Sequence, residues 1–311
     1  MRGACSNLWG ACMPRADRVL RFQARRIYHR LRREVLSRMW GLYASRSRRF
    51  WEALRDRHVG ETAFVIGNGP SLTTGDLDRL KDRLTFASNR IDLAFEHTHW
   101  RPRYFAIADW VLYPKISDQI SSTYRRILAG PDLPRRIGTC RVIQYRWLGR
   151  TNAEPGNGTP PLFSRDAGEG LYSGGTITFD LLQLAAHMGV TRIVLLGCDH
   201  AYTGEDGVDP TGVAEATSGS NHFHPRYRFP GELVRPACID LMSRAFRHAA
   251  AWSEVSGVPI VNATPGGALD VFPRVTLDDE LEGAEVHGAK DEGRQGCQSP
   301  MVGMTTRLPI R

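Results

Sequence analysis

The chain has 311 residues, of which 41% are hydrophobic and 24% charged, the composition of a folded globular protein with a sizeable core. Its apolar runs fall far short of the roughly 18 residues that indicate a membrane span, and its N-terminus shows no signal-peptide pattern. Six cysteines are scattered without a CxxC pair, so neither a zinc motif nor a disulfide framework is indicated. We therefore expect a cytoplasmic protein.

The net charge of +8 originates in an N-terminal arm, residues 1–58. Residues 1–60 contain 15 arginines, no lysine and four acidic residues, so the remaining chain is slightly acidic. Apolar residues recur every three or four positions from Leu20 to Leu42, which is typical of a basic amphipathic helix. Residues 15–57 could therefore pack on the domain, join a second copy in a homo-oligomer, or lie on the inner face of an anionic membrane as a peripheral anchor.

Nucleic acid is the least favoured partner of the arm, because the rest of the chain shows no basic groove and no recognised nucleic-acid-binding module. We therefore expect no nucleic-acid partner.

After the arm, short apolar segments alternate with helical ones over residues 59–279, which we expect to form the catalytic domain. The expected strands are 62–68, 84–89, 103–109, 141–147, 191–199 and 258–263. The expected helices are 75–83, 115–128, 173–189 and 238–257. This alternation predicts an α/β, Rossmann-like, mostly parallel sheet with helices on both faces. Residues 280–311 have few apolar residues and no period, so we expect a disordered tail.

Small or polar residues end four of the expected strands. They are Gly67–Ser71, Asn89, Asp109 and Gly197–Asp199. Ligands of parallel α/β sheets bind at the carboxyl ends of the strands. The four strand ends together therefore form a candidate site.

The stretch FVIGNGPSL, residues 64–72, joins the first strand to a turn of Gly67, Asn68, Gly69, Pro70 and Ser71. Glycine lets backbone amides approach an anion closely, and the N-terminus of the following helix attracts negative charge. The serine could cap that helix or bond a phosphate oxygen. A phosphate-binding turn and a plain strand-to-helix turn both stay open.

Two departures narrow the choice of nucleotide. Leu72 replaces the third glycine of a dinucleotide fingerprint, and Asn89 stands where its ribose-binding acid would be, so NAD is not expected. The lysine of a P-loop is also absent, which argues against ATP hydrolysis of that type.

A second helix start carries the sequence Ser173-Gly174-Gly175. Apolar residues follow at helical spacing from Ile177 to Met188, so at least one face of this helix should be buried. Its first turn would offer a second cluster of amides to an anion. Ordinary helix capping is the alternative.

A loop rich in histidine follows the fifth strand and contains Asp199, His200, Tyr202, His222 and His224. Histidine is the side chain best suited to take a proton near neutral pH. His222 and His224 would share a face of an extended segment, but no third ligand accompanies them, so we predict no metal site. Surface or structural histidines are the alternative.

The motifs GNGPSL, SNR, YSGGT, GCD, NHFHPRY and NATPGGALDVFPR, in this order, resemble the DUF115 family, also called the 6-hydroxymethylpterin diphosphokinase MptE-like family. The resemblance covers about residues 60–275. The pattern is more distantly similar to the bacterial sialyltransferases of glycosyltransferase family 42, which have an Asn-Gly-Pro-Ser turn, a Ser-Gly helix start, a Gly-x-Asp-x-Tyr strand end and a later catalytic His.

The resemblance implies a role for each matching residue. The nucleotide-binding set is Gly67, Asn68, Gly69, Pro70, Ser71, Asn89, Asp109, Ser173, Gly174 and Asp199. Tyr202 would lie by the leaving group together with Asp199. His224 would be the general base, with His222 as the alternative.

Three functions follow from these roles. The first is a glycosyltransferase of cell-surface polysaccharide biosynthesis that moves a sugar from a CMP-sugar or other nucleotide sugar to a glycan or lipid-linked acceptor, without a cofactor. The second is an MptE-like diphosphokinase that transfers diphosphate from ATP to 6-hydroxymethylpterin with Mg²⁺. The DxD sequence at 76–78 is expected to be solvated surface rather than a metal site. The third is a non-catalytic nucleotide-binding protein.

Overall fold

The computed structural model describes residues 24, 47–156, 160–203, 214–216 and 221–282. The chain divides into two units, Met1–Val275 and Thr276–Arg311, and the fold below is that of the first. Most of the predicted arm and nearly all of the predicted tail lie outside the described residues, so the amphipathic helix and the disordered tail stay predictions. Within the described ranges, no helix combines the length and apolar character that crossing a membrane requires.

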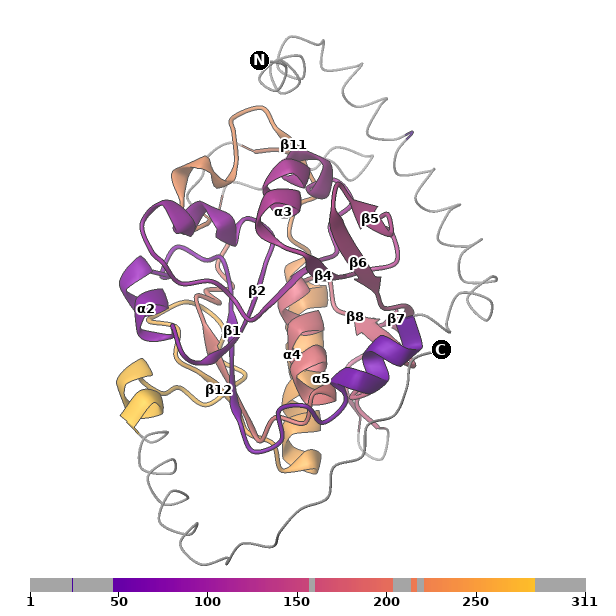
Figure 1. The fold of residues 1–311 in the computed structure, drawn as a ribbon. Coiled ribbons are helices and arrows are strands. Elements are labelled where there is room, and N and C mark those ends of the chain that lie inside the picture. Colours follow the sequence, from indigo (N-terminus) through magenta and orange to yellow (C-terminus); the bar gives the residue numbers. More distant parts are fainter. Residues whose placement is uncertain (1–23, 25–46, 157–159, 204–213, 217–220, 283–311) are drawn as a thin grey trace, which may run out of the picture. The chain divides into compact units, whose positions relative to one another are not determined.

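The centre of the first unit is a sheet of eight described strands in the order β12-β9-β1-β2-β3-β4-β6-β5 (Figure 1). Their bounds are β1 Thr62–Ile66, β2 Leu84–Ser88, β3 Tyr104–Ile107, β4 Arg126–Ala129, β5 Arg136–Ile137, β6 Cys140–Gln144, β9 Arg192–Leu196 and β12 Ile260–Asn262. All neighbours pair in parallel except β5, which is antiparallel to β6.

Helices and two small sheets complete the described part of this unit. The helices are α2 Thr74–Arg79, α3 Ser117–Thr123, α4 Ile177–His187 and α5 Ile239–Ser256, with 3-10 turns η1 Ile91–Glu96, η2 Tyr113–Lys115 and η3 Pro225–Tyr227. The small sheets pair β7 Trp147–Arg150 with β8 Leu171–Ser173, and β10 Ala214–Glu215 with β11 Leu233–Val234.

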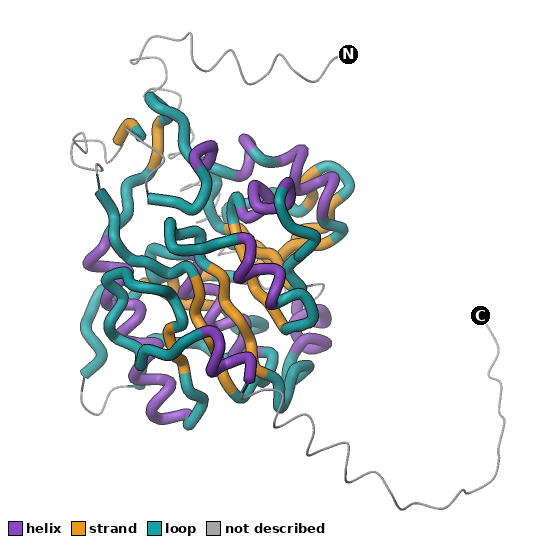
Figure 2. Tube along the Cα trace, turned by 90° about the vertical axis from the view of Figure 1, so that its left-hand side faces the viewer, coloured by secondary structure: helices purple, strands orange, loops and turns teal. Residues whose placement is uncertain are grey.

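The central strands are buried along nearly their whole length. All five residues of β2 are buried, as are the last four of β1 and of β9. Continuous burial requires cover on both faces of a sheet, and Figure 2 shows helices on either side of the strands. The predicted Rossmann-like, mostly parallel α/β fold is confirmed.

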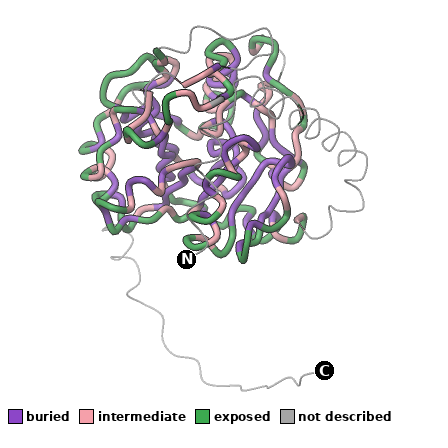
Figure 3. The backbone as a smooth tube through the Cα atoms, turned by 90° about the horizontal axis from the view of Figure 1, so that it is seen from above, coloured by how far each residue is buried: buried purple, intermediate pink, exposed green. Residues whose placement is uncertain are grey.

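Buried segments fill the interior of the domain and exposed segments surround them (Figure 3). Helix α4 belongs to this core, and the helical residues 47–54 contribute Trp51 and Leu54 to it. Trp51 is only 1% exposed, and its Nε1 donates to the carbonyl of Gln144 at 3.1 Å. The Nε2 atom of His187, at the end of α4, lies 2.8 Å from the carbonyl oxygen of Trp51. The end of the predicted arm is therefore packed into the core of the domain that follows it.

Both edges of the sheet are short or covered. On one side, Asn262 of β12 donates its N–H to Pro273 at 2.8 Å and accepts from the N–H of Val275 at 3.1 Å. On the other side, the edge strand β5 consists of Arg136 and Ile137 alone.

Two expectations about the elements are wrong. The helix expected over 115–128 ends at Thr123, and β4 begins at Arg126, because Ile127 and Leu128 are apolar residues that the sheet buries. The helix expected from residue 173 begins at Ile177. The expected end of α5 is confirmed, since Gly257 adopts the left-handed conformation with φ 70°.

We predict that Trp51→Ala lowers the free energy of unfolding by about 3–5 kcal/mol, because it opens a cavity in the core and leaves the Gln144 carbonyl without its donor. Denaturant unfolding of the full chain measures this. Val255→Ala is the control, since Val255 is 76% exposed and should change stability by less than about 0.5 kcal/mol. Equal stability of the two variants would show that residues 47–54 lie outside the folded core.

Candidate functional site

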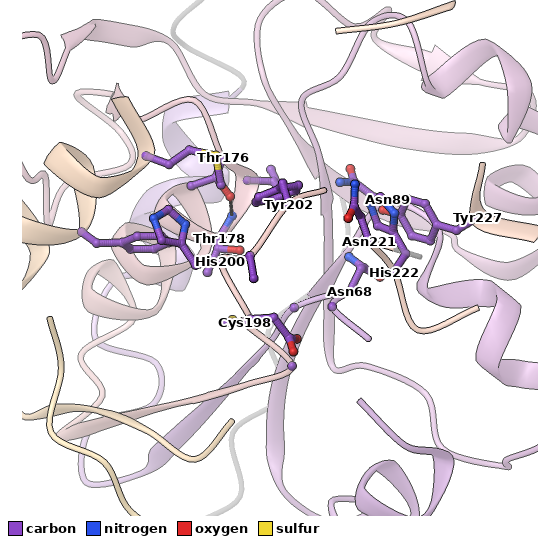
Figure 4. Close-up of a pocket in the computed structure, with 18 residues that line it drawn as sticks. Asn68, Asn89, Thr176, Thr178, Cys198, His200, Tyr202, Asn221, His222 and Tyr227 are labelled. Atoms are coloured by element: carbon purple, nitrogen blue, oxygen red, sulfur yellow. Dashed lines mark hydrogen bonds between the residues drawn. The ribbon is translucent and has the colours of Figure 1, made fainter. Parts of the chain in front are cut away.

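A cavity of about 100 Å³ lies at the carboxyl ends of β1, β2 and β9 (Figure 4). The start of α4, one face of α5 and loop residues between 200 and 227 form the rest of its wall. Of the residues predicted for the site, the cavity is lined by Gly67, Asn68, Gly69, Asn89, Asp199, Tyr202 and His222. The predicted residues outside the lining are Pro70, Ser71, Asp109, Ser173, Gly174 and His224.

The two glycines of the first turn permit β1 and β9 to approach each other closely. A Cβ atom at Gly67 would collide with the carbonyl oxygen of Gly197, and one at Gly69 with the carboxylate of Asp199. The amide of Gly67 donates to Leu196 at 2.8 Å, and the amide of Gly69 donates to Gly197 at 2.9 Å. Packing between the strand ends thus explains both glycines.

Asp199 places a carboxylate against the same turn. Its Oδ2 accepts from the Ser71 hydroxyl at 2.8 Å and from the Ser71 amide at 3.4 Å. Thr73, rather than Ser71, caps α2, because it forms a reciprocal capping box with Asp76. The turn's donors are therefore used within the protein, and the carboxylate disfavours a second anion at this point.

The start of α4 does face the cavity, but through other residues than those predicted. Thr176 is the N-cap and accepts from the N–H of Thr178 at 3.2 Å. Both threonines line the cavity, together with Ile177. Unpaired N–H groups and the positive end of the helix dipole meet at such a start. The sequence does contain a signal for this N-cap, because Thr176 directly precedes Ile177, the first of the periodic apolar residues.

Ser173 and Gly174 have structural roles instead. Ser173 is the last residue of β8 and pairs with Arg150 of β7. A Cβ atom at Gly174 would overlap Ala245 of α5, so this glycine lets the chain pass close to that helix.

Four buried polar atoms of the cavity lining have no hydrogen-bond partner among the described residues. They are Asn68 Oδ1, Asn89 Oδ1, His200 Nδ1 and His222 Nδ1. An unpartnered buried polar atom costs about 1–3 kcal/mol. The Asn68 amide group donates to the carbonyl of Ser88 at 3.3 Å, while its oxygen is buried without a partner among the described residues. Amide oxygens accept hydrogen bonds, whereas a neutral imidazole nitrogen accepts or donates according to its tautomer. The two asparagine oxygens therefore suit a ligand that supplies O–H or N–H donors.

His222 belongs to one wall of the cavity. Its ring stacks on Tyr227 with 3.7 Å between centroids and 9° between planes. Burial, with the charges of Arg228 and Arg90, lowers the pKa of His222 to about 3. Burial also raises the pKa of Tyr227 to about 12. Both rings are therefore neutral at pH 7.

His200 lies on the opposite wall, beside the two threonines of α4 (Figure 4). Its Nε2 lies 2.8 Å from the Ser243 hydroxyl, and its ring packs edge-on against Phe246. Burial lowers the pKa of His200. Its backbone has φ 53°, a conformation rare outside glycine that is held at functional sites when the surroundings enforce it.

The sequence patterns place His200 in the histidine-rich loop but assign it no individual role, although it directly follows the strand end at Asp199. Asn221 was missed as well. Its side-chain oxygen accepts from the N–H of Thr203 at 2.9 Å, and its amide group donates to the Thr203 carbonyl at 2.9 Å, so it joins the two ends of the cavity rim.

Two predicted site residues serve as local caps. His224 Nδ1 accepts from the N–H of Arg226 at 3.1 Å and caps η3. That lone pair is thus unavailable for a proton. Asp109 Oδ1 accepts from the N–H of Val111 at 2.8 Å and of Leu112 at 3.2 Å. Neither side chain lines the cavity.

The carboxylates of the described residues do not form an evident metal site. Within these residues, no three His, Cys, Asp or Glu side chains are grouped so as to hold an ion. Asp76 is used in the capping box of α2, and Asp78 accepts from Thr98. Of the described residues that line the cavity, Asp199 alone carries a carboxylate, and one of its oxygens is bonded to Ser71. The Mg²⁺ ion of the diphosphokinase alternative would therefore find one carboxylate oxygen.

The fold and cavity define a Rossmann-like α/β protein with a polar cavity at the carboxyl edge of its sheet. Comparison with models of protein families, with curated proteins and with solved structures found no match. The resemblance to the MptE-like family and to the sialyltransferases therefore depends on the motifs alone.

We predict that Gly69→Ala lowers the free energy of unfolding by about 1–3 kcal/mol, because the added methyl group displaces the Asp199 carboxylate. Gly75→Ala is the matched control. A methyl group there meets only Thr73 Oγ1 at 3.7 Å, and alanine favours the helix by up to about 1 kcal/mol. An unchanged melting curve for Gly69→Ala would show that β1 and β9 are not held in this close contact.

The low pKa of His222 gives a second prediction. Between pH 6.5 and pH 3 the unfolded chain binds a proton at this position that the folded chain does not. Stability should therefore fall as the pH is lowered through this window, by up to ~1.4 kcal/mol per pH unit from this group. His222→Asn should remove this component, whereas His224→Asn should keep it. Unfolding by denaturant at pH 7 and pH 5 measures the difference, and identical pH dependence of wild type and His222→Asn would refute the assignment.

Proposed function

We propose that the protein is a transferase that moves a sugar from a nucleotide-activated donor, such as a CMP-sugar, to a glycan or lipid-linked acceptor. The observation that carries this proposal is the convergence of four unpartnered buried polar atoms on one cavity at the carboxyl edge of the sheet. Ribose, sugar and nucleobase groups all present O–H or N–H donors of the kind these atoms lack.

The two walls of the cavity suit different parts of such a donor. Asn68 and Asn89 offer acceptor oxygens on one wall, and the neutral ring of His222 lies beside them, which fits the nucleoside. The start of α4 on the other wall fits the phosphate, because α4 has 11 residues and directs its N-terminal dipole there. The glycine turn is less suitable for the phosphate, since Asp199 already neutralises its donors.

The cavity accommodates only part of a nucleotide. Its volume of about 100 Å³ lies below the roughly 300–1,000 Å³ of typical ligand pockets. We therefore expect the rim near Tyr202 and Asn221 to open when the donor binds, and the reacting sugar to lie at that rim.

We assign the general base to His200 rather than to His224 or His222. The Ser243 hydroxyl orients its Nε2, its Nδ1 is buried without a partner among the described residues, and its side chain lies next to the α4 start (Figure 4). This is the arrangement of a base held by a third group. His222, with a pKa near 3, is a poor base at neutral pH but a good neutral acceptor. Tyr202 lies between the walls (Figure 4), where its hydroxyl could stabilise the departing phosphate.

The first test is a thermal-shift screen of the full chain with CMP, CDP, UDP, GDP and ATP, each with and without Mg²⁺. We expect one nucleotide to raise the melting temperature without Mg²⁺, and Asn89→Ala to abolish the shift. The matching nucleotide sugar should then be hydrolysed in the presence of EDTA. Turnover of ATP with a pterin only in the presence of Mg²⁺ would instead support the diphosphokinase. Binding without turnover of any donor would support a non-catalytic nucleotide-binding protein.

The second test concerns the base. His200→Ala should slow transfer or donor hydrolysis by 10²- to 10⁴-fold with the nucleotide affinity kept. His224→Ala is the control and should change the rate by less than about threefold. If His200→Ala keeps the full rate and His224→Ala loses most of it, the general base is His224, as the sequence motif indicates.

A further inference from the structure

A second hollow, an arginine groove, lies between α3 and strands β4, β5 and β6. Its volume is about 760 Å³, and four arginines line it, Arg125, Arg126, Arg136 and Arg141. All four side chains are exposed. The sequence-based expectation that no basic groove exists outside the N-terminal arm is therefore wrong, because these residues are separated in the chain and meet only in the folded sheet.

The sheet register places three of these arginines in a row. Arg141 of β6 pairs directly with Arg126 of β4 on one side and with Arg136 of β5 on the other. Directly paired residues project on the same face of a sheet, and adjacent strands lie about 4.8 Å apart, so the row spans about 10 Å. The N–H of Arg141 also donates to the carbonyl of Arg125 at 2.9 Å, which fixes the backbone beneath the fourth arginine.

The positive charge of the groove is not balanced by the residues around it. No described residue of the lining carries a carboxylate, and none of the four arginines forms an ion pair with a described residue. Like charges on directly opposed strand positions destabilise a sheet. An anion seated between the guanidinium groups would relieve that repulsion.

We propose that the arginine groove binds an anion that carries two or more phosphate groups a few ångströms apart. Guanidinium groups bind phosphate oxygens in a planar, bidentate manner, and a row of three favours several phosphates over one. Hydroxyl groups of Ser122, Thr123 and Thr139 line the same groove. A soluble oligophosphate and the headgroup of a polyphosphorylated or two-phosphate lipid share this chemistry.

Nucleic acid fits the groove less well. Proteins that hold single strands stack bases on exposed aromatic rings. The one aromatic residue of the lining, Tyr124, is instead stacked on Phe105 with 4.4 Å between centroids. Phosphates, rather than bases, are therefore the groups that this surface can recognise.

The groove is separate from the candidate active site. Arg126 is the first residue of β4, a strand that runs parallel to β1, β2 and β3. The groove thus lies at the amino edge of the sheet, whereas the cavity lies at the carboxyl edge. The proposal does not depend on the proposed transferase activity.

Titration calorimetry of the full chain with inorganic tripolyphosphate, at constant ionic strength, tests the site. The groove variant R126Q/R141Q should bind at least ~10-fold more weakly than wild type. The charge-matched control R49Q/R150Q replaces two exposed arginines outside the groove and should change the affinity by less than about twofold. The unliganded groove variant should melt at or above the wild-type temperature, because a like-charge pair has been removed.

Flotation with vesicles of phosphatidylcholine, with and without cardiolipin, identifies the source of the phosphates. If the groove variant loses cardiolipin-dependent flotation but still binds tripolyphosphate, the site is assigned to a lipid headgroup. If it loses tripolyphosphate binding but keeps its flotation, the site is assigned to a soluble anion. Wild-type binding of both probes by the groove variant would overturn the proposal. Groove-dependent binding of an oligouridine more than ~10-fold tighter than tripolyphosphate would overturn it in favour of nucleic acid.

Discussion

The carbonyl oxygen of Gly197 and the carboxylate of Asp199 occupy the space that side chains at positions 67 and 69 would need. This contact draws the end of β1 onto the end of β9 and fixes the strand ends around the cavity. Asn68, between the two glycines, is thereby aimed at β2, where it bonds to Ser88. Asp199, on the other strand, is held by Ser71. The positions of the polar groups in the cavity thus depend on backbone packing that only glycine permits.

The same contact decides what the cavity can bind. A carboxylate bonded to the first turn supplies negative charge where the sequence suggested a phosphate, and the remaining groups of that wall are acceptors. In the function we propose, hydroxyl or amino groups of the ligand lie near β1 and β2, and a phosphate lies only near α4. Positive charge is concentrated at the opposite edge of the sheet, where β4, β5 and β6 bring arginines together. The two ends of one sheet therefore differ in the charge of the side chains that they present.

Much of this arrangement could be predicted from the sequence. Alternating apolar and helical segments indicate a parallel sheet, and polar residues after successive strands must then meet at one edge. Asn68, Asn89 and Asp199 do line the same cavity. Ser173 failed as a helix start because a Ser-Gly-Gly sequence caps a helix and ends a strand equally well, and pairing of β8 with β7 decides between them.

The parts that could not be predicted depend on long-range pairing. The segment Arg125–Leu128 has an apolar spacing that fits a helix turn or a strand, and only its place between β3 and β6 selects the strand. The arginine row requires the register of β4, β6 and β5, including one antiparallel pairing that no local pattern reveals. His200 was passed over because a histidine after a strand end becomes informative only when the hydroxyl of Ser243, 43 positions later, is seen beside it.

The edges of the sheet have a consequence for how copies of this chain can associate. Exposed strand edges recruit strands from other molecules, and proteins prevent this with short strands, charges or covering segments. Here the backbone of Pro273–Val275 occupies the hydrogen-bonding groups of β12, while β5 ends the sheet after two residues, one of them an arginine. A continuous sheet across two copies would have to displace Pro273–Val275 from β12, or pair two β5 edges and so bring two arginine rows together. Within the part of the chain that the structure describes, side-chain surfaces of the helices and loops are therefore better suited to self-assembly than extension of the central β-sheet.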